Sequence, residues 1–263
     1  MKKFGQHFFV MLVLAFLYLP ILILTFYSFT SSTIIGSVRG FSLDNYVTLF
    51  TEPELLSMMF GTILLALVVA LISVLLGTMG AVGPFYSKKR TRSVIEFANE
   101  VPIVNADVVT GFSVCILLIV LFHMDKETYI PLVIAQTALC APFVYLSVTP
   151  RLKAMDPALY EAALDLGCSP SKALVKVVIP QIIPGIISGF MTAITLSLDD
   201  YFIATYTKPA TFDTISTYVV NATRGSQTKI KTALWALSAV IFVIVVISVA
   251  IMNINSEKAK ERA

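Results

Sequence analysis

Residues 161–180 read EAALDLGCSPSKALVKVVIP and lie between two long apolar segments. The stretch predicts two short helices joined at Gly167, because a glycine directly after a helical run is a common helix stop. Ser169 followed by Pro170 then gives the cap and first residue of the second helix. We expect that helix to end before Pro180. These residues therefore predict a structured element rather than a flexible spacer.

The first short helix, capped by Asp156, presents small apolar residues at helical spacing on one face. These residues are Leu159, Ala162, Ala163 and Leu166. A helix pair of this size has no core of its own in which to bury such a face. The loop at residues 150–180 therefore predicts docking into a groove on a partner protein.

The chain around this loop is too apolar for a soluble protein. Of its 263 residues, 57% are hydrophobic and 13% are charged, whereas soluble domains carry about 25% charged residues. A membrane-spanning helix needs roughly 20 apolar residues. Six segments qualify: residues 8–29, 60–86, 101–122, 129–148, 181–206 and 233–254. The sequence predicts one all-α transmembrane domain over residues 1–263, whose first helix is too long in its apolar core to be a signal peptide.

The positive charges predict the orientation of these six helices. Thirteen of the 19 lysines and arginines fall on the side of the N-terminus, among them the run from Lys88 to Arg92. The positive-inside rule places the richer side in the cytoplasm. Both termini and the loop at residues 150–180 are therefore expected to be cytoplasmic.

The same loop carries a recognisable motif. Glu161-Ala162-Ala163, then Gly167, then Val177-Val178-Ile179-Pro180 resembles the EAA motif of binding-protein-dependent ABC importer permeases. The family pattern ends in Ile-x-Leu-Pro, so Val177 and Ile179 are conservative departures. In that family the loop is the coupling helix seated on the ATPase subunit. The resemblance thus implies ATPase-coupling roles for Glu161, Ala162, Ala163, Asp165, Gly167 and Pro180.

The resemblance extends essentially from end to end and has further implications. It implies the fold of a type I ABC importer permease in the bacterial cytoplasmic membrane. It also implies a second, homologous permease, a dimer of ATPase subunits and an extracytoplasmic binding protein. ATP and Mg would be bound by the ATPase, and no cofactor by this chain.

Within the family, the chain is most similar to the PotC-type permeases of spermidine/putrescine importers. This similarity is carried by the run from Glu161 to Gly167, by Leu196-Ser-Leu-Asp-Asp200 and by Asp107-Val-Val. The segment Gly40-Phe-Ser-Leu-Asp-Asn-Tyr46 also resembles the wider family. The resemblance implies polyamine transport and a polyamine-binding partner.

Three carboxylates lie inside predicted spans: Asp107, Asp199 and Asp200. An aspartate at mid-bilayer costs about 2.5–3.5 kcal/mol on insertion scales, so such residues usually face a bundle interior or water. We expect Asp107 about two turns into its helix and the pair toward the outer end of the fifth. Since adjacent helix positions are about 100° apart, at most one of the pair points into a central path. The acids are candidates for a cation path, and helix–helix hydrogen bonds or interfacial positions are the alternative.

Several functional classes find no support. The chain has no Gly-x-x-x-x-Gly-Lys-Ser/Thr phosphate loop, so ATP hydrolysis is expected on a partner and this chain is not expected to be an enzyme. The net charge of +3 gives no reason to expect nucleic-acid binding. Three scattered cysteines are too few for a disulfide framework or a zinc site. We expect no catalytic residue and no metal ligand.

Three other interpretations remain. A permease of the same family could carry another small organic solute. A secondary transporter could use Asp107 as a proton relay, and an intramembrane aspartyl protease could pair Asp107 with Asp199. The last two leave the loop at residues 150–180 unexplained, and the Gly-x-Gly-Asp context of such proteases is missing.

Overall fold

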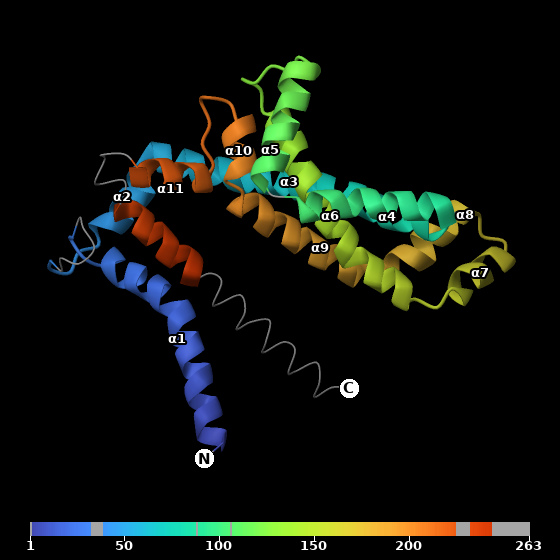
Figure 1. Ribbon diagram of the computed structural model, residues 1–263, viewed down its shortest axis with the longest axis horizontal. Helices are drawn as coiled ribbons and strands as arrows, with labels where there is room; N and C mark the ends of the chain where they lie inside the picture. The colour runs from blue at the N-terminus through green and yellow to red at the C-terminus, as the bar shows by residue number, and fades with distance from the viewer. Residues whose placement is uncertain (1, 33–38, 88, 106, 225–231, 244–263) are drawn as a thin grey trace. The chain divides into compact units, whose positions relative to one another are not determined.

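The computed structural model describes residues 2–32, 39–87, 89–105, 107–224 and 232–243. In these parts the regular secondary structure is helical, apart from one antiparallel bridge between Thr30 and Phe41 (Figure 1). The helices are α1 (Lys2–Ser28), α2 (Asp44–Thr51), α3 (Pro53–Phe85), α4 (Lys89–Val104), α5 (Asp107–Cys115), η1 (Ile116–Leu121), α6 (Ile130–Ala154), α7 (Ala158–Asp165), α8 (Pro170–Ala173), η2 (Leu174–Val178), α9 (Ile179–Asp199), α10 (Phe202–Thr207) and α11 (Ile215–Arg224). A further apolar helix covers Thr232–Val243. The chain divides into two compact units, residues 1–57 with 219–263, and residues 58–218.

Four helices of the described chain are long and apolar enough to cross a membrane. They cover His7–Ser28, Pro53–Pro84, Ile130–Ala154 and Pro170–Asp199. The predicted segment at residues 101–122 instead contains the end of α4, then α5 and η1, with a sharp bend between α4 and α5; it is a fifth span if this broken pair crosses as one. Of the predicted segment at 233–254, residues 244–254 lie outside the described residues.

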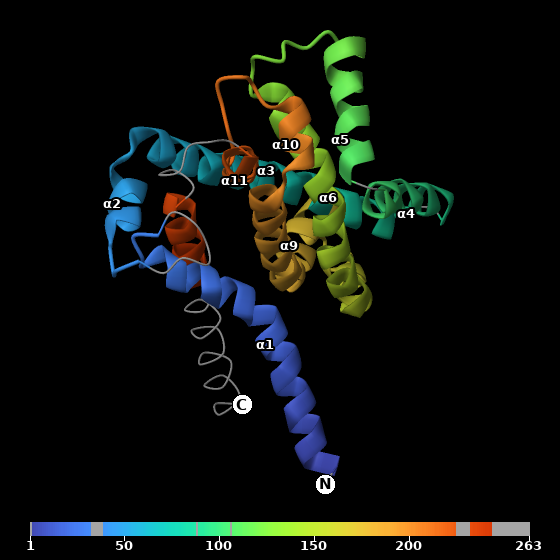
Figure 2. The same ribbon diagram turned by 60° about the vertical axis from the view of Figure 1, so that its left-hand side comes forward.

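The larger unit is organised around α6 and α9, which lie side by side (Figure 1, Figure 2). Every fourth residue on one face of α9 is small and buried: Gly185, Gly189, Ala193 and Ser197. Residues spaced by four share a helix face, so this stripe lets two backbones approach closely. The facing residues of α6 are also spaced by four and buried: Gln136, Cys140, Val144 and Val148.

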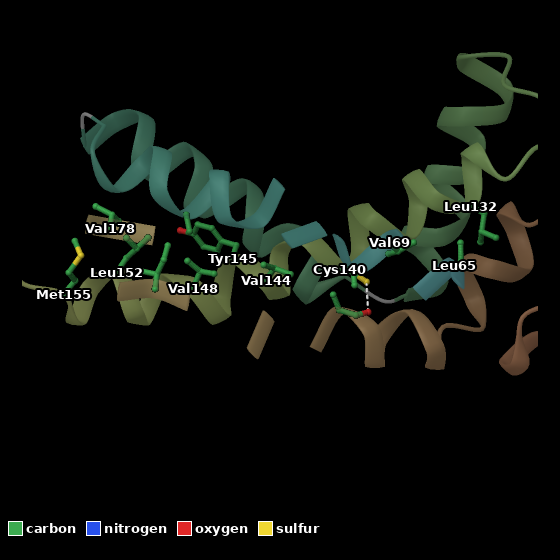
Figure 3. Packing of buried hydrophobic residues seen from close by; sticks show 14 of the residues in the cluster. Leu65, Val69, Leu132, Cys140, Val144, Tyr145, Val148, Leu152, Met155 and Val178 are labelled. Carbon is green, nitrogen blue, oxygen red and sulfur yellow. Dashed lines mark hydrogen bonds between the residues drawn. The ribbon is translucent and has the colours of Figure 1, made fainter. Parts of the chain in front are cut away.

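Contacts along the seam fix the register of the two helices. The Ser197 hydroxyl donates to Gln136 Oε1 over 2.8 Å, and the Cys140 thiol donates to the Ala193 carbonyl over 3.6 Å (Figure 3). A Cβ added at Gly189 would lie 3.0 Å from Val144 Cγ1. A larger side chain there would therefore separate the helices.

Apolar side chains continue from this seam toward the start of the helical run that ends in α9. Leu152, Val178 and Ile182 are fully or almost fully buried, and Figure 3 shows Leu152 near Val178 and Met155. Tyr160 of α7 and Leu174 of η2 pack against the same cluster. The loop at residues 150–180 is therefore anchored on the core of the larger unit.

The smaller unit explains the segment from Gly40 to Tyr46. The Asn45 amide donates to the carbonyls of Ser28 and Thr30 over 2.9 and 3.1 Å. The Tyr46 hydroxyl is hydrogen-bonded to that of Ser28 over 2.8 Å. Asn45 thus satisfies the Ser28 carbonyl, which the end of α1 leaves unpaired, and Tyr46 adds a side-chain bond to the same residue.

Candidate functional site

The EAA loop, residues 150–180, begins with a capped helix. The Asp156 carboxylate accepts the Ala158 N–H over 2.9 Å at the start of α7. At the other end, Gly167 has a φ of +85°. Its N–H donates to the Leu164 carbonyl over 2.9 Å, and the N–H of Cys168 donates to the Ala163 carbonyl over 3.0 Å. This pair of bonds is a Schellman motif, which explains why a glycine ends the helix.

The face that the sequence assigned to a partner divides in two. Of the predicted face, Leu159, Ala162 and Leu166 are exposed, Leu166 at 86%, as are Glu161 and Asp165 on the same helix. Ala163 is only 8% exposed, because it faces the protein's own interior. Ala162 and Ala163, which are adjacent in the motif, therefore serve different surfaces.

Pro180 does not end a helix, contrary to the expectation from the sequence. One helical run extends from Pro170 through η2 and Pro180 to Asp199. The residues before Pro180 form a π-helical segment, in which the Ile179 N–H donates to the Leu174 carbonyl five residues earlier. This wider turn accommodates the proline's missing donor without breaking the run. The exposed Pro180 thus lies within the helix that connects the EAA loop to Asp199.

A pair of tyrosines ties α7 to the end of α3. The rings of Tyr86 and Tyr160 lie 4.5 Å apart between centroids, tilted by 39°. Tyr160 directly precedes Glu161 in the sequence. The position of the exposed face of α7 is thus set by two contacts, the aromatic pair and the buried Ala163.

The second region of interest is the junction between α9 and α10, where Asp200 is the residue most completely enclosed by hydrogen bonds. Its Oδ2 accepts the Gln136 amide and the Ala204 N–H, both over 2.9 Å. Its Oδ1 accepts the Ile203 N–H over 3.0 Å, and its carbonyl accepts the Ser216 hydroxyl over 2.6 Å. Asp200 is only 8% exposed. The carboxylate thus caps α10 and joins it to α6, and the backbone carbonyl joins the junction to the start of α11.

Asp199 and Asp107 differ from Asp200 in being exposed. Asp199 is the last residue of α9, where a negative charge adds to the negative end of the helix dipole. Asp107 is the first residue of α5, not two turns into a helix, because α4 ends at Val104. A negative charge at the N-terminal end of α5 is favourable, because that end of the helix dipole is positive.

The junction and the start of α5 lie close together. Asp107 lies one helical turn before Gly111, and Asp200 lies three residues before Ile203. Next to them, α5 and α10 pack so tightly that a Cβ added at Gly111 would lie 3.1 Å from the Cα of Ile203. The structure therefore brings together the acids of two separate predicted spans.

Sequence reasoning missed Gln136, Ser197 and Ser216, which complete the hydrogen bonding of the junction. A glutamine inside an apolar segment is the signal that could have identified the first of them, because a polar side chain in a span needs a partner. Nothing in the spacing of the two serines distinguishes them from the other serines in the chain.

One open pocket of about 480 Å³ follows a face of α4. It is lined by Phe97, Glu100, Val101, Val104 and Asn105. Glu100 is exposed. In the part of the chain that the structure describes, no three His, Cys, Asp or Glu side chains are grouped so as to hold a metal ion.

Comparison with known proteins agrees with the motif in the EAA loop. The model of a family described as "Binding-protein-dependent transport system inner membrane component" matches residues 1–261. The chain is 30% identical to the putrescine transport system permease protein PotI of Escherichia coli K12, over 80% of this chain and 76% of PotI. It is 26% identical to the spermidine/putrescine transport system permease protein PotC of Haemophilus influenzae, over 97% of this chain and 99% of that protein.

Solved structures resemble the fold. A chain of a bacterial ABC transporter involved in the import of the acidic polysaccharide alginate superposes with a TM-score of 0.69 and 20% identity, over 95% of this chain and 96% of that one. At this level of identity the similarity concerns the fold and not the cargo.

Proposed function

The chain belongs to the binding-protein-dependent transport system inner membrane components, as a PotC-type permease subunit and not an enzyme, and on that premise we propose that it carries polyamines across the cytoplasmic membrane. Its relatives transport putrescine, or spermidine and putrescine, according to their names. A polyamine is a flexible organic polycation, so its path requires carboxylates that are reachable from water. The observation that carries the proposal is the exposure of two acids at helix ends, Asp199 at the end of α9 and Asp107 at the start of α5 after the break that follows α4.

Helix breaks suit a cation path for a physical reason. The C-terminal end of a helix carries partial negative charge, and transporters commonly place substrate sites where spanning helices are discontinuous. The exposed Asp199 adds a full charge to the C-terminal end of α9. The exposed Asp107 follows the break after α4. These two acids are the ones we propose to meet the cation directly.

We propose six spans with both termini in the cytoplasm, on the strength of the lysine and arginine distribution. A second, homologous permease would complete the path, and an extracytoplasmic polyamine-binding protein would deliver the substrate. A dimer of ATPase subunits would bind ATP and Mg, since this chain has no phosphate loop. Alternating access would then follow the ATP cycle.

The EAA loop is the proposed contact with the ATPase. Its support is the exposed surface formed by Glu161, Ala162, Asp165 and Leu166 on a helix that is itself anchored from behind. An exposed leucine beside a small residue fits a groove on a partner. Gly167 and Pro180 contribute by shape, through the Schellman turn and the continuous helix.

Adjacent alanines provide a test of this contact. Ala162→Trp should lower uptake about tenfold or more, because the bulky ring stands in the proposed interface, yet leave thermal stability unchanged. Ala163→Trp should instead destabilise the chain itself by about 1–3 kcal/mol, because Ala163 is buried. Uptake assays and thermal unfolding of the purified chain distinguish the two. Normal uptake by Ala162→Trp would exclude this face as the docking surface.

Uptake of labelled putrescine and spermidine tests the proposed function. Cells that carry the complete set of subunits should accumulate at least one amine, and Asp199→Asn should raise its KM about tenfold or more, since a lost charge contact with the cation costs more than about 1.4 kcal/mol. Glu127→Gln is the matched control, because Glu127 is also an exposed acid and lies in the loop between η1 and α6.

The contrary outcomes identify the alternatives. If the wild type takes up neither amine but another organic solute, the family assignment stands and the polyamine proposal fails. If uptake persists without the ATPase and follows the proton gradient, the chain is a secondary transporter.

A further inference from the structure

Asp200 differs from its neighbour Asp199 in that most of its hydrogen-bonding capacity is used within the protein. Three N–H groups point at its two carboxylate oxygens, from Gln136, Ile203 and Ala204. At 8% exposure, the residue is also closed to water. A carboxylate so arranged holds parts of the protein together.

Asp200 lies between two helical elements, following the end of one and capping the start of the other. On one side is the unbroken helical run from Pro170 to Asp199, which starts inside the EAA loop. On the other side is α10, whose first N–H groups Asp200 accepts. The run ends at Asp199, so Asp200 directly follows it and links it to α10.

Two further contacts determine what α10 does when the run moves. Gly111 of α5 meets the backbone of Ile203, with 3.1 Å left for any Cβ, so α10 cannot move without α5. The Asp200 carboxylate and the Ser197 hydroxyl are both bonded to the Gln136 amide, which binds the junction to α6. Asp107 lies at the start of α5.

We propose that Asp200 is a positioning residue for transport: it transmits movement of the helical run that starts in the EAA loop to α10 and α5, and does not itself contact the cation. The proposal rests on the proposed function and deepens it. It assigns different tasks to adjacent acids, with Asp199 meeting the substrate and Asp200 holding the junction.

Asp200 and Gln136 are both buried and hydrogen-bonded to each other, so exchanging their chemical groups provides a specific test. In Asp200→Asn, an NH₂ group replaces one carboxylate oxygen. Turned toward Gln136, it leaves both the Gln136 amide and the Ala204 N–H without an acceptor; turned the other way, it leaves the Ile203 N–H without one. In the double variant with Gln136→Glu, the new carboxylate accepts from the side-chain amide introduced by Asp200→Asn and from the Ser197 hydroxyl. The link between α6 and the junction is thereby restored, with the charge moved away from its original position.

The experiment uses the complete transporter reconstituted in liposomes, with rates expressed per assembled complex. Asp200→Asn should lower the maximal rate of polyamine uptake about tenfold or more with KM within about twofold of the wild type. Adding Gln136→Glu should recover most of that rate. Asp199→Asn should do the reverse, raising KM about tenfold or more while the maximal rate is kept.

A substrate-free measurement separates this inference from the polyamine assignment. Spin labels at Ser113→Cys on α5 and Leu75→Cys on α3, both exposed positions, report the distance between α5, which moves with α10, and α3 after the three native cysteines are replaced. A change on binding ATP should occur in the wild type and be lost in Asp200→Asn. This holds even if neither amine is transported, in which case only the proposed substrate is wrong.

Three results would overturn the inference. A raised KM with an unchanged maximal rate in Asp200→Asn would make Asp200 a substrate contact. A normal rate per complex with less complex assembled would make it a purely structural residue. An unaltered ATP-dependent distance change in Asp200→Asn would show that the junction transmits nothing.

Discussion

Replacing Gly167 by proline should abolish ATP-coupled uptake while the membrane helices remain folded. Gly167 has a φ of +85°, whereas proline fixes φ near about −65° and has no N–H to donate. The variant therefore loses the bond to the Leu164 carbonyl, and α8 leaves α7 in a different direction. Since a side chain at Gly167 would meet nothing within 4 Å, the damage stays local. Uptake and ATP hydrolysis of the complete transporter measure the effect, with thermal unfolding as the check on folding.

Gly167→Asn is the matched variant. Asparagine enters the left-handed region more readily than other residues with a side chain and keeps its N–H, so most of the uptake should remain. Equal uptake by the proline and asparagine variants would mean that the turn after α7 has no part in coupling.

Gly77→Ala should destabilise the chain although it adds only one methyl group. A Cβ at Gly77 would lie 2.7 Å from the Ala141 carbonyl oxygen and 2.7 Å from Val144 Cβ. Val144 also faces Gly189 of α9, so it fills the space between α3 and α9 and cannot withdraw. Overpacking of this kind costs about 1–3 kcal/mol. The expected result is a lower thermal midpoint for the purified chain in detergent.

Gly83→Ala in the same helix is the control. Nothing lies within 4 Å of a Cβ at Gly83, and replacing a glycine inside a helix by alanine favours the helix by up to about 1 kcal/mol. The two glycine-to-alanine changes should therefore shift the midpoint in opposite directions. Equal midpoints would contradict the close approach of α3 and α6 at Gly77.

The sequence was sufficient to predict features that depend only on residues close together in the chain. The turn at Gly167 follows from the conformational freedom of glycine, and the cap at Asp156 from the reach of a short carboxylate to a nearby N–H. The apolar segments at residues 60–86 and 129–148 correspond to α3 and α6 because length and hydropathy alone make a helix suitable for lipid. The prediction that the helix ends before Pro180 was wrong. A π-helical turn before Pro180 accommodates the proline, and no residue pattern in the sequence indicates that turn.

The sequence by itself determined the membrane class, the family motif and the acids worth examining, because composition and spacing are properties of the chain. Only the tertiary structure decided which of two neighbours faces inward: Ala163 and not Ala162, Asp200 and not Asp199. Adjacent residues in a helix or at its end point in different directions. Which of them is buried depends on the elements that pack against the helix. For Asp200 that is Gln136, 64 residues earlier in the chain. A contact of this range depends on how α6 and α9 pack, and no local pattern records it.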